Sequence, residues 1–327
     1  MSDFHLAHHG SFALHGAAMC FVEATAVEAR DRSSLMDNGI WSDDHIPNIK
    51  KVADLVHLLG GRIGLQLAHA GRKSSAPSRY TKDPPEELWL DEVVGPSAVK
   101  YNDPHHYNPR EMTVEQIQST IASFGAAAAR AAKAGIDMVE IHGAHGYLIH
   151  NFLSFVSNLR TDEYGGPSLK NRARLLMEII QVVRANFPAD RPISLRISCT
   201  DWIEYKGEPS WDLEQSIELA EMIRDAGVDL LDCSTGGNDP DQKIPLFPGY
   251  QVQFAAEIKK RVPGLLVSTV GIINSGQLAE DILQEGKADM VRVGRGFLKH
   301  PNLPEHFARE LNAKIAYQPT YGAGRHA

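Results

Sequence analysis

Seven short runs rich in aliphatic and β-branched residues recur along this chain, and helical patterns separate them. The predicted strands are Met19–Val27, Arg62–Leu67, Met138–His142, Ile193–Ile197, Leu230–Ser234, Leu266–Val270 and Met290–Val293. Strand, helix and strand repeated in this way imply parallel pairing with the helices outside. The order of elements therefore predicts an α/β fold built on a parallel sheet.

The segments between the strands carry apolar residues at three- and four-residue spacing, which indicates amphipathic helices. These segments are Asp3–Gly16, Asp43–Leu59, Thr113–Ala134, Lys170–Asn186, Asp212–Ala226, Tyr250–Arg261 and Ser275–Gln284. Small turns at Ala134-Gly135, Ala226-Gly227 and Glu285-Gly286 close helices just before the next strand. A glycine in the left-handed conformation ends a helix in this way.

The preferred closed form of this alternation is an eight-stranded TIM (β/α)8 barrel, of which seven strands are recognisable. The segment Asp3–Gly16 is already helical in pattern, so the strand expected before it is the missing one. We therefore predict a TIM-type barrel that is incomplete at its N-terminus. No repeat, low-complexity tract or linker divides the sequence, and residues 1–327 are predicted to form a single domain.

One long interruption of the alternation covers residues 72–109 and is rich in Pro, Ser and charged residues. Loops of this length in compact domains are commonly functional. We predict that residues 72–109 form a lid over the carboxyl ends of the strands.

The composition excludes several classes of partner. The formal net charge is −8 and the Lys and Arg residues are scattered, so neither nucleic acid nor an anionic membrane surface is an expected partner. No run of about 18 apolar residues is present, and the N-terminal sequence lacks the regions of a signal peptide. Cys20, Cys199 and Cys233 are far apart and partly inside apolar runs, which favours reduced thiols and a cytoplasmic protein.

The stretch Met138–Gly166 begins as a buried strand and then brings His142, His145 and Tyr147 together. Ligands bind at the carboxyl ends of strands in parallel α/β folds, so an active-site loop is expected here. Two histidines three residues apart are also compatible with a helical surface pair or half of a zinc site. Zinc needs a third and usually a fourth ligand, and no cysteine or carboxylate cluster accompanies the nearby His150, so we predict no metal.

Six segments, in order along the chain, carry a recognisable pattern. They are Gln66–Lys73 (QLAHAGRK), Val93–Ala98 (VVGPSA), Pro109–Thr113 (PREMT), Ile141–Ser154 (IHGAHGYLIHNFLS), Ser157–Gly166 (SNLRTDEYGG) and Val293–Pro304 (VGRGFLKHPNLP). Together they resemble the old yellow enzyme family, and most closely its thermophilic-like branch of flavin-dependent ene reductases. The resemblance covers nearly the whole chain, from Asp3 to about Tyr317.

The resemblance implies a barrel that holds FMN at the carboxyl ends of its strands, with NADPH or NADH as reductant. In such enzymes the flavin passes a hydride from N5 to the β-carbon of an activated alkene, an enone or enal, while a proton reaches the α-carbon. That small-molecule alkene is the expected partner. Two alternatives stay open: a relative with weak or no FMN binding that isomerises or cyclises its substrate, and an inactive truncated fragment.

The resemblance also assigns the catalytic roles. His142 and His145 match the family's pair of hydrogen-bond donors, which stabilise the negative charge that develops on the substrate carbonyl oxygen. Tyr147 corresponds to the usual proton donor. Without the resemblance, a lone tyrosine after a strand would more often be a packed aromatic residue.

Seven residues are expected to bind FMN: Ala24, Gln66, Arg196, Ser234, Gly271, Gly294 and Arg295. By resemblance, Gln66 presents its amide to the pyrimidine ring, Ala24 leaves room for the flat ring system, and Ser234 lies near the ribityl chain. A buried cation such as Arg196 needs an anionic partner; in the family that partner is the reduced flavin, and a structural salt bridge is the alternative. The two glycines and Arg295 follow the last two strands, where barrels commonly build a phosphate site.

Two departures from the family pattern concern the ends of the chain. The family's first strand lies beneath the flavin, and no matching segment is found here. A barrel without that strand has two exposed strand edges, which must pair or be covered. The resemblance also allows a homo-oligomer. In the branch, an arginine shortly after a C-terminal tyrosine enters the neighbouring subunit's active site, whereas Arg325 is displaced from that position.

Overall fold

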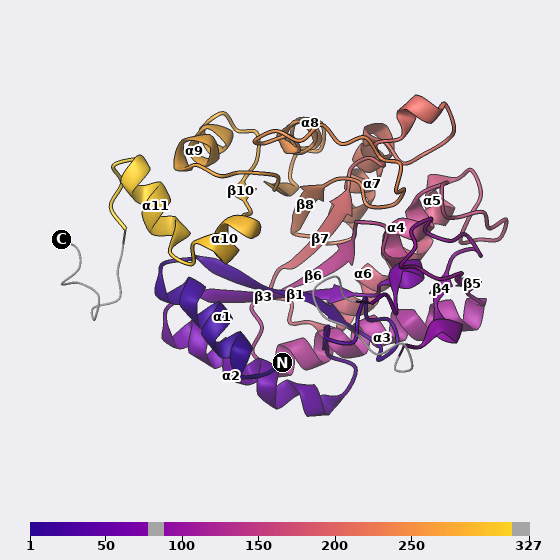
Figure 1. Ribbon diagram of the computed structural model, residues 1–327, viewed down its shortest axis with the longest axis horizontal. Helices are drawn as coiled ribbons and strands as arrows, with labels where there is room; N and C mark the ends of the chain where they lie inside the picture. Colours follow the sequence, from indigo (N-terminus) through magenta and orange to yellow (C-terminus); the bar gives the residue numbers. More distant parts are fainter. Residues whose placement is uncertain (78–87, 316–327) are drawn as a thin grey trace.

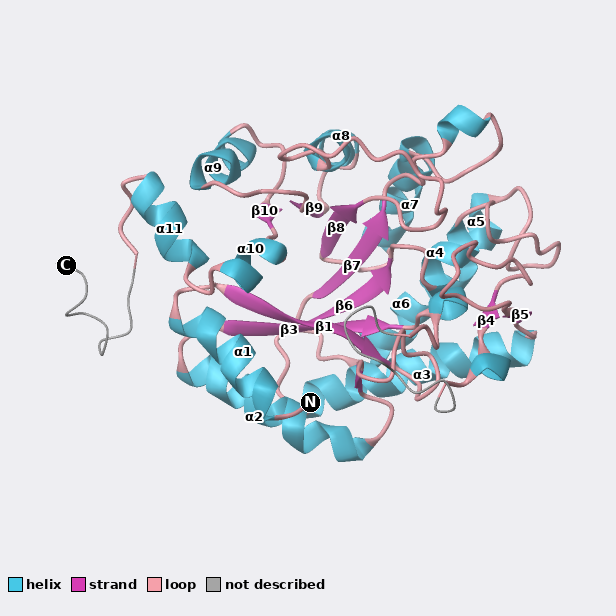
Figure 2. Cartoon of the chain, in the orientation of Figure 1, coloured by secondary structure: helices cyan, strands magenta, loops and turns pink. Residues whose placement is uncertain are grey.

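The structure of the protein, a computed structural model, describes residues 1–77 and 88–315 (Figure 1). Its main element is an eight-stranded parallel sheet in the order β10-β9-β8-β7-β6-β3-β1-β2. Helices surround the strands on the outside (Figure 2). The predicted α/β class is therefore confirmed.

All seven predicted strands are present, and their ends differ from the expected ones by at most two residues. They are β1 (Met19–Ala26), β3 (Arg62–Ala68), β6 (Met138–Gly143), β7 (Ile193–Ser198), β8 (Leu230–Ser234), β9 (Leu266–Thr269) and β10 (Met290–Val291). The sequence did not predict the eighth strand, β2 (Asn38–Gly39), which pairs with Thr25 and Ala26 of β1. Two residues are too few to show a strand's alternation of polar and apolar side chains.

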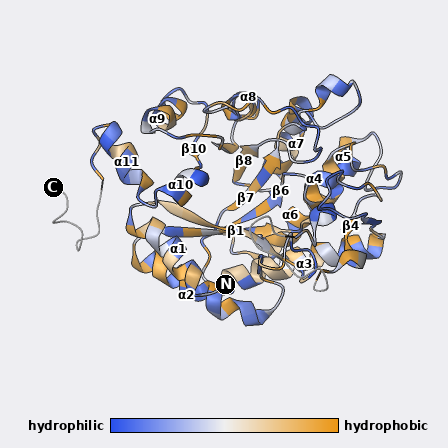
Figure 3. Ribbon diagram, in the orientation of Figure 1, coloured by the Kyte–Doolittle hydropathy of each residue, from blue (hydrophilic) through white to orange (hydrophobic). Residues whose placement is uncertain are grey.

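The predicted helices are also present, and several carry polar and apolar residues along their length (Figure 3). They are α1 (Asp3–Leu14), α2 (Ile46–Leu58), α3 (Val114–Lys133), α6 (Arg174–Asn186), α7 (Leu213–Asp225), α8 (Val252–Arg261) and α9 (Gly276–Gln284). The predicted helix Lys170–Asn186 is divided into α5 (Leu169–Arg172) and α6. Three further helices in the described residues were not predicted: α4 (Leu148–Leu153), α10 (Arg295–Lys299) and α11 (Leu303–Glu310). Gly135, Gly227 and Gly286 have the left-handed backbone conformation expected of helix-ending glycines.

The central strands present one apolar and one polar face, because successive side chains point in opposite directions. The apolar face packs in the core, and its fully buried members include Leu65, Ile141 and Leu195. On the polar face, Glu140 of β6 accepts a hydrogen bond from Gln66 of β3 and pairs with Arg292, which follows β10. Since β6 and β10 are not neighbours in the sheet, the polar face lies inside the barrel.

Among the residues that the structure describes, no hydrogen-bonded ladder joins β10 to β1, so the curved sheet is open along one side. The short strand β10 is partly exposed, and Met290 retains 36% of its accessible surface. Phe297 of α10 contacts Phe12 of α1, with ring centroids 5.3 Å apart. These two helices therefore approach each other beside the open seam.

The predicted lid, residues 72–109, lies only partly within the described residues, because residues 78–87 fall outside them. The described part contains β4 (Val94–Gly95), which pairs with β5 (Arg110–Glu111). Arg325 also lies outside the described residues. The three cysteines are buried and free, as predicted. In the described parts of the chain, we find no helix with the length and hydropathy needed to cross a bilayer.

Candidate active site

The three predicted catalytic residues meet where β6 ends. His142 belongs to the strand itself, and the turn that follows carries His145 and Tyr147 to the same place. The centroid of the His142 ring lies 5.2 Å from that of His145 and 5.1 Å from that of Tyr147, which it meets edge to face. Three side chains that can donate hydrogen bonds therefore face one small region at the barrel mouth.

Backbone geometry fixes the turn that follows β6, residues 144–147, which is the predicted catalytic turn and is called the catalytic turn below. His145 has a φ of +60° and Gly146 a φ of +71°, and a Cβ atom on Gly146 would lie 2.2 Å from the Gly237 carbonyl oxygen. The His145 backbone N–H donates to Ser198 Oγ at 2.9 Å, and Lys73 Nζ donates to the His145 carbonyl oxygen at 2.9 Å. The turn is thus held by the end of β7 and by the segment that follows β3.

A buried contact between a histidine and a carboxylate supports the same turn. Nδ1 of His150 accepts the Gly146 backbone N–H at 3.0 Å, and its Nε2 lies 3.1 Å from Asp201 Oδ1. Asp201 Oδ2 accepts hydrogen bonds from Ser154 Oγ at 2.6 Å and from the Trp211 backbone N–H at 3.1 Å. Sequence reasoning considered His150 only as a zinc ligand and missed this role, because nothing in the local spacing links it to Asp201.

Both histidines of the predicted catalytic set are neutral at neutral pH. Burial lowers the pKa of His142 and of His145 well below the usual value, and the nearby positive charge of Arg196 lowers each further. A neutral imidazole still donates one hydrogen bond. Burial also raises the pKa of Tyr147, so its phenol keeps its proton into the alkaline range.

The predicted FMN residue Ser234 lies beside the catalytic pair. Its Oγ is 2.7 Å from Nε2 of His145 and 3.4 Å from Oε1 of Gln251. Gln251 Oε1 also accepts a hydrogen bond from Thr235 Oγ1 at 2.7 Å. Sequence reasoning missed Gln251, since it precedes α8 in a segment without strand or motif signals.

Two more of the predicted FMN residues lie on the first strands of the sheet. Gln66 of β3 is buried and donates to Glu140 Oε1 at 2.8 Å. Ala24 of β1 lines a narrow cleft together with Tyr147 and several small side chains, Ala26, Ala68 and Ala70. The rest of its lining is polar or charged: Asp31, Arg32, Ser33 and Asp37.

Arg196 finds its anionic partner within the protein. Its Nε lies 3.0 Å from Oδ2 of Asp232 on the adjacent strand, where the two residues are in register. This is the structural salt bridge that the sequence left as an alternative. The Arg196 side chain nevertheless remains 23% exposed, and its charge acts on both catalytic histidines.

The remaining predicted residues follow β9 and β10. Gly271 has a φ of +126°, and a Cβ atom there would lie 3.0 Å from the Gln251 amide nitrogen and from the Tyr250 ring. Gly294 precedes α10, which begins at Arg295. The structure therefore brings a tightly packed glycine and a basic residue to the same edge of the sheet as the catalytic turn.

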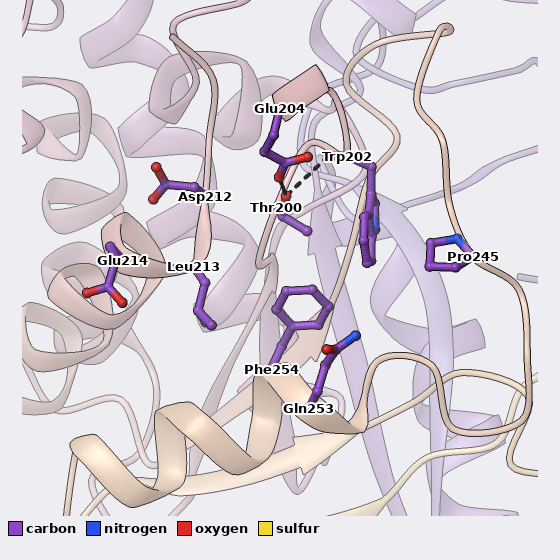
Figure 4. Close-up of a pocket in the computed structure, with 9 residues that line it drawn as sticks. All are labelled: Thr200, Trp202, Glu204, Asp212, Leu213, Glu214, Pro245, Gln253 and Phe254. Atoms are coloured by element: carbon purple, nitrogen blue, oxygen red, sulfur yellow. Dashed lines mark hydrogen bonds between the residues drawn. The ribbon is translucent and has the colours of Figure 1, made fainter. Parts of the chain in front are cut away.

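A separate cavity of about 600 Å³ lies outside this site (Figure 4). It is lined by Thr200, Trp202, Glu204, Asp212, Leu213, Glu214, Pro245, Gln253 and Phe254, none of which is a predicted site residue. Each of its three carboxylates has a partner in the protein. Glu204 accepts a hydrogen bond from the Thr200 hydroxyl, Asp212 accepts one from the Gln215 backbone N–H, and Glu214 pairs with Arg261. The catalytic turn, rather than this cavity, is the candidate reaction site.

In the described part of the chain, no three His, Cys, Asp or Glu side chains are grouped so as to bind a metal ion. The parallel strands and the polar groups at their carboxyl ends define a barrel enzyme that works on a ligand bound at the mouth. The chain belongs to the NADH:flavin oxidoreductase / NADH oxidase family, whose model matches residues 1–314. It is therefore a flavin-dependent oxidoreductase with FMN as cofactor and a reduced nicotinamide nucleotide as electron donor.

Individual relatives agree with this assignment. The chain is 42% identical to an NADPH dehydrogenase of Bacillus subtilis, over 99% of this chain and 89% of that protein. It is 43% identical to an NADH:flavin oxidoreductase of Gibberella zeae, over 96% of this chain and 79% of the relative. Morphinone reductase has a similar fold, with a TM-score of 0.78 and 28% identity over 98% of this chain and 83% of its own. An old yellow enzyme homologue from Zymomonas mobilis has a TM-score of 0.74 and 25% identity, over 96% of this chain and 88% of its own. The old yellow enzyme resemblance and the TIM-barrel fold are thus confirmed.

The residues at the mouth fit FMN chemically. Nδ1 of His142 is buried without a hydrogen-bond partner, and the Arg196 guanidinium remains partly exposed beside it. Together with the Gln66 amide, these two polar groups are hydrogen-bonding partners of the kind that the ring system of FMN would need. Gly294, after β10, has no atom within 4 Å of the place its Cβ would take, so it allows the close backbone approach that a phosphate needs.

Proposed function

We propose that this protein transfers a hydride, through FMN, from NADPH or NADH to the β-carbon of an activated alkene such as an enone or enal. The observation that carries this proposal is the convergence of His142, His145 and Tyr147 on one region at the barrel mouth. FMN, when bound, supplies the hydride chemistry. The protein residues orient the alkene, stabilise charge and deliver a proton.

The two histidines act as donors to the substrate carbonyl oxygen, where negative charge develops. Because both imidazoles are neutral, each has one N–H to offer and no positive charge to be desolvated. Donors that are fixed before the reaction stabilise the developing charge without reorganisation. The backbone contacts of His145 with Ser198 and Lys73 provide that fixed geometry.

Tyr147 donates the proton to the α-carbon. Its side chain is half-buried beside the histidines, and its raised pKa keeps the phenol protonated at neutral pH. A developing carbanion next to a carbonyl is a strong enough base to accept that proton. The edge-to-face contact with His142 holds the phenol toward the same region.

FMN is proposed to bind through the seven residues that follow from the resemblance. Gln66 and Arg196 would contact the ring system, Ala24 would pack on it, and Ser234 would lie near the ribityl chain. Gly271, Gly294 and Arg295 would hold the phosphate. Support comes from their shared position at the carboxyl ends of β1, β3, β7, β8, β9 and β10.

We further propose that residues 1–327 act as one FMN-binding domain with residues 72–109 as a lid, and that homo-oligomers form. Lys73 supports the lid proposal, because it reaches from the lid to the catalytic turn. The free, buried cysteines favour a reducing compartment, the cytoplasm. The net charge of −8 argues against a nucleic-acid partner.

The test is the visible spectrum of the purified 327-residue chain with FMN, after removal of excess cofactor. We expect a flavin spectrum that bleaches with NADPH and returns when an enone such as cyclohexenone is added. His142→Ala and His145→Ala should keep the flavin but lose most of the enone step. A colourless, folded protein that isomerises an alkene would instead support the non-redox alternative.

A further inference from the structure

The inside of the barrel holds four charged groups beneath the catalytic turn. Two are carboxylates, Glu140 on β6 and Asp232 on β8, which are 1% and 0% exposed. Two are guanidinium groups, those of Arg196 on β7 and of Arg292 after β10. Buried charges are tolerated only when they are paired, so each of these groups depends on the others.

Arg292 crosses the barrel interior to reach three other strands. Its guanidinium pairs with Glu140 and donates to Ser194 Oγ at 3.1 Å, and its Nε lies 3.5 Å from Asp232 Oδ1. Its Cζ also lies 4.4 Å from the centroid of the Phe21 ring on β1. Within the described residues, no ladder hydrogen bonds join β10 to β1, so this side chain bridges the open seam.

The two arginines share one carboxylate. Oδ2 of Asp232 lies 3.0 Å from Nε of Arg196. Oδ1 of Asp232 faces Arg292 and accepts a hydrogen bond from Ser268 Oγ at 2.8 Å. Arg292 is only 13% exposed, whereas Arg196 is 23% exposed and acts on the catalytic histidines. Asp232 therefore links a deep cation to one at the reaction site.

Charge balance determines what each arginine contributes at the barrel mouth. With both arginines present, the two carboxylates are matched by two positive charges. Without Arg292, Arg196 would be the only cation facing two buried carboxylates, and more of its charge would be offset by Asp232. The electrostatic potential above Arg196 would then become less positive.

We propose that Arg292 is a positioning residue that, by sharing Asp232, sets the positive charge that Arg196 presents to the bound flavin. The inference rests on the proposed function in one respect, namely that Arg196 lies beside FMN. Reduced FMN carries more negative charge than oxidised FMN, so the potential above Arg196 favours the reduced form. Arg292 would thereby raise the reduction potential of the bound cofactor.

The experiment measures the midpoint potential of FMN bound to the full-length chain, by equilibration with a reference dye. We expect Arg292→Met to weaken binding of reduced FMN relative to oxidised FMN by about tenfold, equivalent to a potential about 30 mV more negative for this two-electron couple. Arg292→Lys keeps the charge and should stay near the wild-type potential. Asp232→Asn removes the shared carboxylate and should shift the potential in the opposite direction.

A double-mutant cycle with Arg196→Met tests whether Arg292 acts through Arg196. We expect Arg292→Met to add little shift in the Arg196→Met background. An unchanged potential in Arg292→Met, or an equal shift in both backgrounds, would overturn the inference while leaving the proposed function intact. If Arg292→Met does not fold, Arg292→Gln, which removes the charge but keeps a hydrogen-bond donor, is measured in both backgrounds and judged by the same outcomes. A wild-type chain that binds no FMN would overturn both proposals.

Discussion

The imidazole of His150 and the carboxylate of Asp201 are in contact and closed off from solvent, with Nε2 and Oδ1 3.1 Å apart and both side chains 0% exposed. Through its other ring nitrogen, His150 holds the backbone of the catalytic turn at Gly146. The pair therefore couples the stability of the barrel to the geometry of the reaction site.

We expect Asp201→Ala to lower the free energy of unfolding by about 3–5 kcal/mol, because it leaves a buried histidine and two donors without their acceptor. The exposed pair of Lys50 with Asp54 gives a matched control. Asp54→Ala should leave the melting temperature nearly unchanged, since exposed pairs contribute little. Urea unfolding of both variants makes the comparison, and equal stability losses would contradict the assigned role.

Gly146→Ala should abolish the proposed activity, because its Cβ atom would lie 2.2 Å from the Gly237 carbonyl oxygen. Gly135 also has a positive φ, +84°, but no atom lies within 4 Å of the place its Cβ would take. Gly135→Ala should therefore cost only about 1 kcal/mol of stability and keep full turnover. Enone reduction by the two purified variants separates steric disruption of the turn from general backbone strain.

Local patterns in the sequence were sufficient to predict seven strands and the position of the turn that carries His142, His145 and Tyr147. The run MVEIH reads as a buried strand, and the polar residues that follow it mark the carboxyl end at which a parallel fold binds ligands. His142, His145 and Tyr147 lie within six residues of one another, so the local chain direction alone brings them together. The structure places all three as that reading implied.

The charged interior could not be predicted, because its members are far apart in the sequence. Glu140 and Arg292 meet only when β6 and β10 curve around the same interior, and no local spacing encodes that contact. Arg196 illustrates the limit well: the sequence required an anionic partner for it, and the strand register supplies Asp232. The two-residue strand β2 is likewise defined only by its partner β1.

Stability should fall in mild acid because of His69, whose pKa burial lowers to about 4. Between that value and an unfolded value of about 6.5, the unfolded chain binds a proton that the folded chain does not. The contribution of neutral His69 to the free energy of unfolding is fully present above about pH 6.5. About 3 kcal/mol of it is lost as the pH falls to about 4. The free energy of unfolding, measured with urea at several pH values, should depend less steeply on pH in His69→Asn than in the wild type. An identical pH dependence would contradict this account.

Tyr147→Phe isolates proton delivery from the other steps of the reaction. Removing the phenol oxygen leaves the ring to pack on His142, so FMN content and the rate of bleaching by NADPH should be unchanged. The return of the flavin spectrum with enone should slow by about 10²- to 10⁴-fold, the usual contribution of a positioned acid. Tyr205→Phe serves as the control, because that hydroxyl donates to the Asp241 carbonyl oxygen at an exposed position. Stopped-flow spectra follow both half-reactions in one preparation, and a Tyr147→Phe enone step as fast as that of the control would exclude Tyr147 as the proton donor.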